Sequence, residues 1–250
     1  MSPSSRLVEH EELDGLAADD PRGLRSRRDL RRVHVAMRSI SILQRAVATL
    51  RLAAQPRRIL ELGAGDGTLL LRFARAQRPR WNDVQLTLLD RVDLVSEQTR
   101  AGYRELGWQV SLLRADALEW AASGQNGRYD LCFANLFLHH FEAAPLTLLL
   151  QAVAAATDAF VACEPRRSNI ARLGSRLIVL LGANKVTRDD AVKSVAAGFA
   201  DRELSAAWNT AGGDWNLVEF PALPFSHCLA AARAKSRVRT GEPQRSVDEL

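Results

Sequence analysis

The amino-acid sequence predicts an α/β protein with a doubly wound, seven-stranded and mostly parallel sheet. Three observations lead to this fold class. Five short apolar runs alternate with helical patterns between residues 58 and 163, which is typical of parallel strands joined by helices. The first run stops at a cluster of glycines and passes directly into a helix. Two further apolar runs follow each other closely near the C-terminus, so they are expected to close the sheet as an antiparallel hairpin.

Each expected strand is a short apolar run, and the seven runs cover 58–62, 84–90, 109–113, 129–135, 159–163, 215–220 and 225–232. Helices with one apolar face are expected over 67–77, 93–106 and 146–156. Before the first strand, apolar residues recur at helical spacing between residues 25 and 52, while the opposite face is rich in arginine. One or two helices are therefore expected there.

The 250 residues are expected to form one domain with additions. Residues 1–54 are predicted to be a loosely held polar tail and a helical cap, and 55–233 the main domain. The segment 165–213 is too long for a simple connection, so it is predicted to be a helical insertion that acts as a lid, with Thr187 as a helix cap. Residues 234–250 are expected to be a flexible tail.

The composition excludes several classes of protein. Hydrophobic residues make up 47% of the chain and charged residues 25%, as in ordinary soluble globular proteins, and the net charge of +5 is by itself a weak indication of a nucleic-acid partner. No apolar run reaches the roughly 18 residues of a membrane span, and an N-terminal secretory signal is not expected. The three cysteines, Cys132, Cys163 and Cys228, lie far apart and are expected to be free buried thiols in the cytoplasm. No metal-ligand spacing is present, so no metal is predicted.

The turn after the first strand has an unusual set of residues. It holds glycines at alternate positions, Gly63, Gly65 and Gly67. This spacing differs from a dinucleotide fingerprint, because Thr68 stands where that fingerprint has glycine. Glu61 and Asp66 flank the turn and would repel a pyrophosphate, but they would attract an ammonium or sulfonium group.

The stretch 58–75 resembles the first motif of class I S-adenosylmethionine methyltransferases, although another Rossmann-like strand and turn is the alternative. The run 129–141 is similar to the fourth motif of the methyltransferases of ubiquinone and menaquinone biosynthesis. The resemblance covers about residues 55–165. It implies a Rossmann-like fold, S-adenosylmethionine as cofactor, and methyl transfer to a small or lipophilic acceptor.

Three acids end successive predicted strands, where ligands bind in open α/β sheets. The resemblance implies that Glu61 lies under the methionine portion, Asp90 binds both ribose hydroxyls, and Asp116 binds the adenine amino group beside the Ala117 N–H. Each acid could instead only cap a helix. The full set expected to contact the cofactor is Glu61, Gly63, Ala64, Gly65, Asp66, Gly67, Asp90, Arg91, Asp116, Ala117, Asn135 and Leu136.

Methyl transfer to a phenol requires a group that removes the hydroxyl proton, and a histidine titrates in the right range. His139 and His140 are the catalytic candidates; the alternative is that one packs under the cofactor or caps a helix. Arg166 and Arg167 could bind an acidic group of the substrate or lie on the surface. The chain lacks the motif at Asn135 that marks methyltransferases of exocyclic amines in DNA or of glutamine.

The leading hypothesis is an O- or C-methyltransferase of a small phenolic, quinol or polyketide-like metabolite, in bacterial secondary or quinone metabolism. An RNA methyltransferase is the second hypothesis, because residues 25–51 carry an arginine-rich face, but no RNA-binding module is recognisable. The third is a non-catalytic protein that binds S-adenosylmethionine. No nucleic-acid partner is expected. Peripheral contact with a membrane through the basic face remains open.

Overall fold

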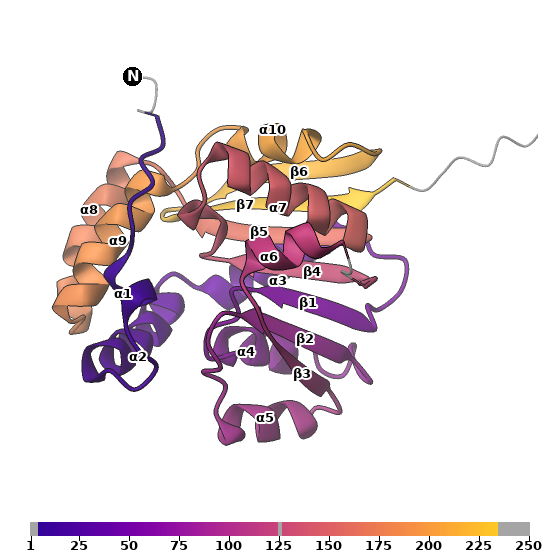
Figure 1. Cartoon of the computed structure of the whole chain (residues 1–250), viewed down its shortest axis with the longest axis horizontal. Helices are drawn as coiled ribbons and strands as arrows, with labels where there is room; N and C mark the ends of the chain where they lie inside the picture. The colour runs from indigo at the N-terminus through magenta and orange to yellow at the C-terminus, as the bar shows by residue number, and fades with distance from the viewer. Residues whose placement is uncertain (1–4, 125–126, 235–250) are drawn as a thin grey trace, which may run out of the picture.

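The computed structural model describes residues 5–124 and 127–234 and contains one seven-stranded sheet in the order β3-β2-β1-β4-β5-β7-β6 (Figure 1). Strands β1 to β5 are parallel, and β7 runs antiparallel to both β5 and β6. The bounds are β1 Arg58–Leu62, β2 Gln85–Asp90, β3 Gln109–Arg114, β4 Leu131–Asn135, β5 Ala159–Pro165, β6 Trp215–Ala222 and β7 Ser226–Arg233. The predicted fold class and closing hairpin are confirmed.

The helices are α1 Glu12–Gly15, α2 Pro21–Ala36, α3 Ser39–Thr49, α4 Thr68–Gln77, α5 Glu97–Arg104, α6 Ala117–Ser123, α7 Ala143–Ala156, α8 Asn169–Leu177, α9 Lys185–Ala197 and α10 Glu203–Asn209. Two 3₁₀ turns are η1 Leu138–His140 and η2 Ile178–Leu181. The helix α6 was not expected, because its seven residues give too little periodicity to read. The tail expected from residue 235 on lies outside the described residues.

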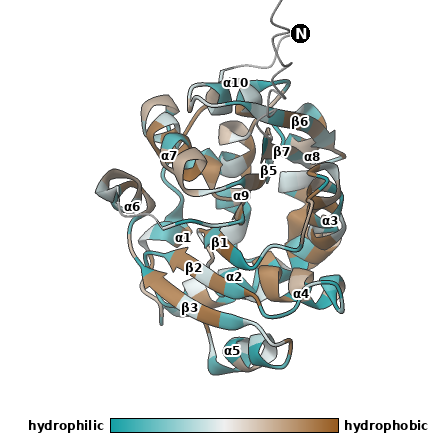
Figure 2. Ribbon diagram, turned by 90° about the vertical axis from the view of Figure 1, so that its right-hand side faces the viewer, coloured by the Kyte–Doolittle hydropathy of each residue, from teal (hydrophilic) through white to brown (hydrophobic). Residues whose placement is uncertain are grey.

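Two hydrophobic cores sandwich the sheet. Helices α3, α4 and α5 cover one face, and α6, α7 and α10 cover the other (Figure 2). Successive residues of a strand point to opposite faces, so Ile59 belongs to the first core while Leu60 and Leu62 belong to the second. Burial on both faces explains why the central strands are continuous apolar runs. It also leaves the carboxyl ends of the strands as the place where polar side chains can gather.

The N-terminal helical region divides into two helices with different surroundings. Arg38 adopts a left-handed conformation, with φ 57°, and separates α2 from α3. The apolar residues of α3, including Leu43 and Val47, pack into the core as predicted. Those of α2, including Leu30 and Val33, are only half-buried and line a cavity instead. The single apolar face expected over residues 25–52 is thus two faces with different neighbours.

The expectation of a loosely held N-terminal segment is wrong for residues 5–20. Asp190 of α9 accepts hydrogen bonds from the backbone N–H groups of Glu12 (2.8 Å) and Leu13 (2.9 Å). Arg6 donates to the carbonyl of Ala197 at 2.8 Å. These polar residues satisfy partners nearly two hundred residues away, so composition could not reveal that the segment is docked.

The insertion after β5 has two parts. Helices α8 and α9 join α1 and α2 in a cap on one side of the sheet, at the left of Figure 1. Helix α10 packs on α7, β6 and β7 instead, so it belongs to the main domain and not to a lid. The cap of α9 is Asn184, whose side chain accepts from the Thr187 N–H at 2.9 Å, so the predicted cap at Thr187 is wrong. Within the described residues, no helix is both long and apolar enough to cross a membrane.

Candidate active site

A cavity of about 1010 Å³ lies between the carboxyl ends of the central strands and the cap. The glycine turn forms one end of it and the helices of the cap form the other. Of the residues predicted to contact the cofactor, all except Gly67 line it: Glu61, Gly63, Ala64, Gly65, Asp66, Asp90, Arg91, Asp116, Ala117, Asn135 and Leu136. Gly67 is the N-cap of α4, with φ 67°, and its carbonyl accepts a hydrogen bond from the buried Tyr103 hydroxyl at 2.9 Å. Its contacts are with the protein and not with the cavity.

Gly63 is required by both its conformation and its neighbour. Its φ of 62° is a region that side chains disfavour, and an added Cβ would lie 2.2 Å from the Phe137 ring. Gly65 has a similar φ of 56°, but a Cβ there would meet nothing within 4 Å. The two glycines therefore serve different needs, since only Gly63 is packed against the loop that follows β4.

Asp90 is held in place by the backbone. One carboxylate oxygen accepts from the Gly65 N–H at 2.8 Å, and the other accepts from the Val92 N–H at 3.0 Å. Each oxygen can accept a further hydrogen bond from the cavity, because a carboxylate offers about four acceptor positions. Asp116 similarly accepts from the Leu118 N–H at 2.7 Å and caps α6 while lining the cavity. Backbone contacts and ligand binding are thus compatible for both acids, and Asp116 also caps a helix.

Glu61 is the most unusual group at this end of the cavity. Its side chain is only 4% exposed, and its Oε2 atom has no hydrogen-bond partner within the described part of the chain. Burial raises the pKa of Glu61 well above its usual value, and the nearby carboxylates of Asp66 and Asp90 raise it further. A buried carboxyl group without a partner is costly, so this position favours a cationic ligand.

Asp66 connects the glycine turn to the cap. One of its oxygens accepts from the Thr68 hydroxyl at 2.6 Å and from the Thr68 N–H at 3.0 Å. The other forms an ion pair with Arg31 of α2 at 3.0 Å. Sequence analysis gave no partner for this acid. The pair shows that α2 of the cap also reaches the glycine turn.

His139 is buried between two carboxylates. Its Nδ1 lies 2.8 Å from Glu164 Oε2, and its Nε2 lies 3.3 Å from Glu11 Oε1. Burial alone would lower the pKa of His139, but the two carboxylates raise it to about 9. The ring is therefore protonated near neutral pH and has no free nitrogen to accept a proton. This arrangement does not support His139 as a catalytic base.

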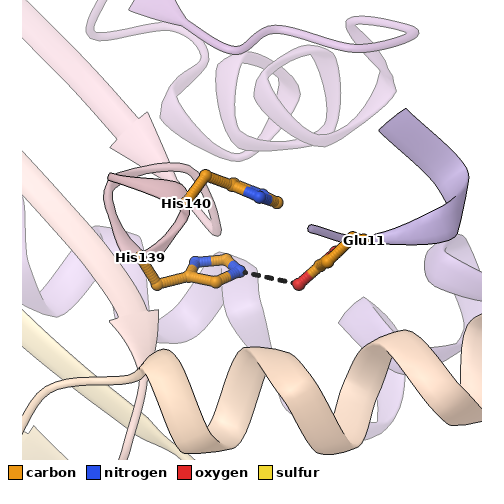
Figure 3. A group of neighbouring side chains, drawn as sticks. All are labelled: Glu11, His139 and His140. Carbon is orange, nitrogen blue, oxygen red and sulfur yellow. Dashed lines mark hydrogen bonds and ion pairs between the residues drawn. The ribbon is translucent and has the colours of Figure 1, made fainter. Parts of the chain in front are cut away.

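His140 differs from its neighbour. It is half-buried and lines the cavity, and its Nδ1 lies 3.2 Å from Asp14 Oδ2. Burial lowers the pKa of His140, and the charge of His139 lowers it further. Figure 3 shows the two rings one above the other, with Glu11 reaching them from the N-terminal segment. One ligand-type atom of each of these three side chains lies within 4.8 Å of the others, a spacing that could hold a metal ion.

The expected substrate contacts of Arg166 and Arg167 are not supported. Neither residue lines the cavity. The Arg167 guanidinium is buried and forms two hydrogen bonds to Glu203, at 2.6 and 2.9 Å, and one to the Gly198 carbonyl at 2.6 Å. It ties the end of β5 to α10, which is a structural role that the sequence pattern could not distinguish from substrate binding.

Several site residues were missed by sequence analysis. Glu164 is the last residue but one of β5, as Glu61 is of β1, so the rule that found the other acids applies to it as well. Glu11, Asp14 and His34 gave no signal, because they belong to the N-terminal segment and α2, whose contacts are distant in sequence. His34 lines the cavity, and burial lowers its pKa to about 4, so it is a neutral ring.

Residues 59–158 match the family model of a methyltransferase domain. This range includes the glycine turn, the three strand-end acids and both histidines of η1. The match agrees with the reaction that the sequence predicted. It does not confirm the ubiquinone and menaquinone type. No protein of curated function matches the chain significantly.

Solved structures share the fold at low identity. An O-methyltransferase family protein from Burkholderia thailandensis is 18% identical with a TM-score of 0.59; the alignment covers 88% of this chain but only 62% of that one. The plantazolicin methyltransferase BpumL in complex with S-adenosylhomocysteine is 15% identical with a TM-score of 0.61, covering 86% and 92%. Magnesium protoporphyrin IX methyltransferase from Synechocystis, also with S-adenosylhomocysteine, is 16% identical with a TM-score of 0.52, covering 83% and 86%. These likenesses confirm the fold.

Proposed function

We propose that this protein is an S-adenosylmethionine-dependent methyltransferase that acts on a small apolar molecule with a hydroxyl group. The observation that carries the proposal is Glu61, a buried carboxyl group whose Oε2 lacks a partner at the cofactor end of the cavity. The α-ammonium group of S-adenosylmethionine supplies a cation at such a position, directly or through water. The methyltransferase-domain match and the two solved relatives with S-adenosylhomocysteine support the same cofactor.

The remaining cofactor contacts follow from the strand ends. Asp90 would accept both ribose hydroxyls on its free acceptor positions, and Asp116 would accept from the adenine amino group. Asn135 and Leu136, at the end of β4, would lie beside the sulfonium. We treat residues 58–233 without α8 and α9, together with α3 that packs on them, as the cofactor-binding domain, and residues 5–36 with α8 and α9 as the cap over the acceptor.

The acceptor end of the cavity has an apolar wall beside the histidines of η1. Leu30 and Val33 of α2, Met37 just after it, and Ile178 and Leu181 of η2 line this wall. This lining favours a phenol, a quinol or a polyketide-like compound over a highly charged substrate. His140 lies at this end, with Asp14 on its Nδ1, and is the side chain that would engage the acceptor hydroxyl and draw its proton. His139 would hold the loop in place.

Exposed apolar residues beside the cavity favour an acceptor that is taken from a membrane surface. Leu177, Leu180 and Leu181 line the cavity and are also exposed, Leu180 by 80%. Ile170 and Leu173 continue the exposed apolar face along α8, and the exposed Arg176 lies beside them. Leucines flanked by arginine fit an anionic lipid surface. In a flotation assay with phosphatidylglycerol vesicles, Leu180→Glu should reduce binding, whereas Leu148→Glu on α7 should not.

The RNA hypothesis is less well supported. Several arginines of the basic face are engaged within the protein: Arg31 pairs with Asp66, Arg32 with Asp29, and Arg27 with the Ala18 carbonyl. Tight RNA binding in a filter assay that falls steeply with salt would restore the RNA hypothesis.

A non-catalytic role is also less favoured, because the cavity extends well beyond the glycine turn. Three unpaired cysteines fit the reducing cytoplasm.

The reaction can be tested with S-adenosylmethionine labelled on its methyl group and a panel of phenols, quinols and alkylresorcinols. We expect the label to move into the organic phase with at least one of these acceptors, and not into added RNA. Asp90→Asn should slow the transfer, while Asp93→Asn, an exposed acid three residues away, serves as the matched control. Absence of transfer and of cofactor binding in the wild type would refute the proposal.

A further inference from the structure

The geometry points to a metal site at the acceptor end of the cavity, in which Glu11, His139 and His140 bind one divalent ion of the zinc type. The three side chains come from two segments that lie far apart in sequence. Both histidines belong to η1, and Glu11 precedes α1. Figure 3 shows the Glu11 carboxylate facing the His139 ring, with the His140 ring above it, and one ligand atom of each of the three lies within 4.8 Å of the others. Two imidazoles and a carboxylate are a common set for zinc and for other first-row divalent ions.

The distance between His139 Nε2 and Glu11 Oε1 suits a metal ion. His139 Nε2 and Glu11 Oε1 are 3.3 Å apart. A charge-assisted hydrogen bond between such groups is shorter, at about 2.7–2.9 Å. By contrast, two ligands at about 2.0–2.1 Å from a tetrahedral zinc ion are separated by roughly 3.3 Å. The pair is therefore loose for an ion pair and correctly spaced for two ligands.

Both histidines have the outer partners that metal-binding histidines use. His139 Nδ1 contacts Glu164 at 2.8 Å, and His140 Nδ1 contacts Asp14 at 3.2 Å. A carboxylate on Nδ1 fixes the ring and leaves Nε2 for the ion, which on His139 would displace the proton that faces Glu11. Glu164 is itself fixed, because it accepts from three successive backbone N–H groups at the start of η1. Two adjacent histidines that served only as structural contacts would not both need a carboxylate on Nδ1.

An ion in this place has a consequence for the reaction, which rests on the proposed function. Three protein ligands leave at least one coordination position of the ion free. Because His140 lines the cavity, this free position is expected to face the cavity. An acceptor hydroxyl bound there would lose its proton more easily. His140 then acts as a ligand, and its effect on the hydroxyl passes through the ion. The ion would also hold the N-terminal segment against η1.

The site can be tested by adding Zn²⁺ to chelator-treated, full-length protein and measuring binding by calorimetry, with Co²⁺ absorption as a second readout. We expect one equivalent of either ion and a Co²⁺ spectrum of low coordination number. Glu11→Gln and His140→Gln should each weaken binding by more than about 100-fold, since loss of an outer partner alone costs about 10–100-fold. Asp14→Asn should fall in that lower range.

Two neighbouring residues provide matched controls. Glu9 and His10 are exposed and adjacent to Glu11, so Glu9→Gln and His10→Gln should bind Zn²⁺ as the wild type does. Ion binding should also slow hydrogen exchange over residues 5–20, which adsorption to surface histidines would not do. If circular dichroism shows that a ligand variant does not fold, the inference is tested by Asp14→Asn, which changes a partly exposed position, and by the hydrogen-exchange data.

The inference is overturned if the wild type binds neither ion at micromolar concentrations, or if the controls lose binding while Glu11→Gln and His140→Gln keep it. Its failure is separable from failure of the proposed function. Chelator-treated protein should still bind S-adenosylmethionine, because the residues of the cofactor end lie outside the cluster. Metal binding without cofactor binding would refute the methyltransferase proposal alone.

Discussion

The two ends of the cavity are built in different ways. The cofactor end consists of the glycine turn and the strand ends between Glu61 and Leu136, all within the segment that matches a methyltransferase domain. The acceptor end is assembled from the N-terminal segment, α2, η1 and the insertion, which are joined by polar contacts such as those of Asp190. The comparison shows that a fixed cofactor platform is combined with a cap whose parts depend on one another. Changes at the two ends should therefore have different consequences.

The largest effect is expected for Gly63→Ala, which places a methyl group where the glycine turn packs against Phe137 at the cofactor end. The left-handed conformation costs about 1–2 kcal/mol for a residue with a side chain, and the clash with Phe137 adds about 1–3 kcal/mol. We expect a marked loss of thermal stability and of S-adenosylmethionine binding.

Gly65→Ala is the matched control for this prediction. It carries the same conformational strain but its Cβ meets no protein atom, so it should lose less stability. Thermal unfolding of both variants measures the difference. Equal melting temperatures would show that the contact between the glycine turn and the Phe137 loop is unimportant.

Asp90→Asn should weaken cofactor binding without unfolding the protein. A hydrogen bond to a charged group is worth about 1.5–3 kcal/mol, so loss of one ribose contact predicts roughly a tenfold to hundredfold rise in Kd. Calorimetry with S-adenosylhomocysteine measures it. Asp93→Asn should leave the Kd unchanged, because Asp93 is half-exposed and pairs with Arg100. An equal effect in both variants would indicate general electrostatics and not a ribose contact.

Asp190→Ala tests the acceptor end. It leaves the Glu12 and Leu13 N–H groups without their partner, at a cost of about 1–3 kcal/mol each if they stay buried. The N-terminal segment should therefore detach and exchange its amide hydrogens faster. Methyl transfer should fall, while the Kd for S-adenosylhomocysteine should stay within about threefold. A large loss of cofactor affinity would mean that the two ends are not separable.

The last prediction concerns the pH dependence of stability, in Glu61→Gln. Burial raises the pKa of Glu61 well above 4.5, so the folded protein without cofactor keeps a proton that the unfolded chain releases. Stability associated with this group is present below pH 4.5 and falls as pH rises, by at most about 1.4 kcal/mol per pH unit. The variant should lack this slope in urea unfolding between about pH 5 and pH 8. Parallel slopes would show that Glu61 ionises freely.

The same division explains what the sequence could predict. The strands, the glycine turn and the acids Glu61, Asp90 and Asp116 follow from local patterns, because each signal lies within one strand and the turn after it. Helices before the first strand and in the insertion were also predicted, but their docking on one another could not be, since it joins residues such as Arg6 and Ala197 through single polar groups. His139 and His140 were found, but their different roles depend on Glu11 and Asp14, which no local pattern connects to them.

The most direct test of the central claim compares two ligands on two proteins. S-adenosylhomocysteine carries the amino-acid portion, whereas 5′-methylthioadenosine shares its adenosine but lacks the ammonium group. If Glu61 receives that ammonium group, calorimetry should show that Glu61→Gln weakens S-adenosylhomocysteine binding by about tenfold or more and leaves methylthioadenosine binding unchanged. Asp90→Asn should weaken both ligands alike. Equal losses for both ligands in Glu61→Gln, or no loss for either, would contradict the account.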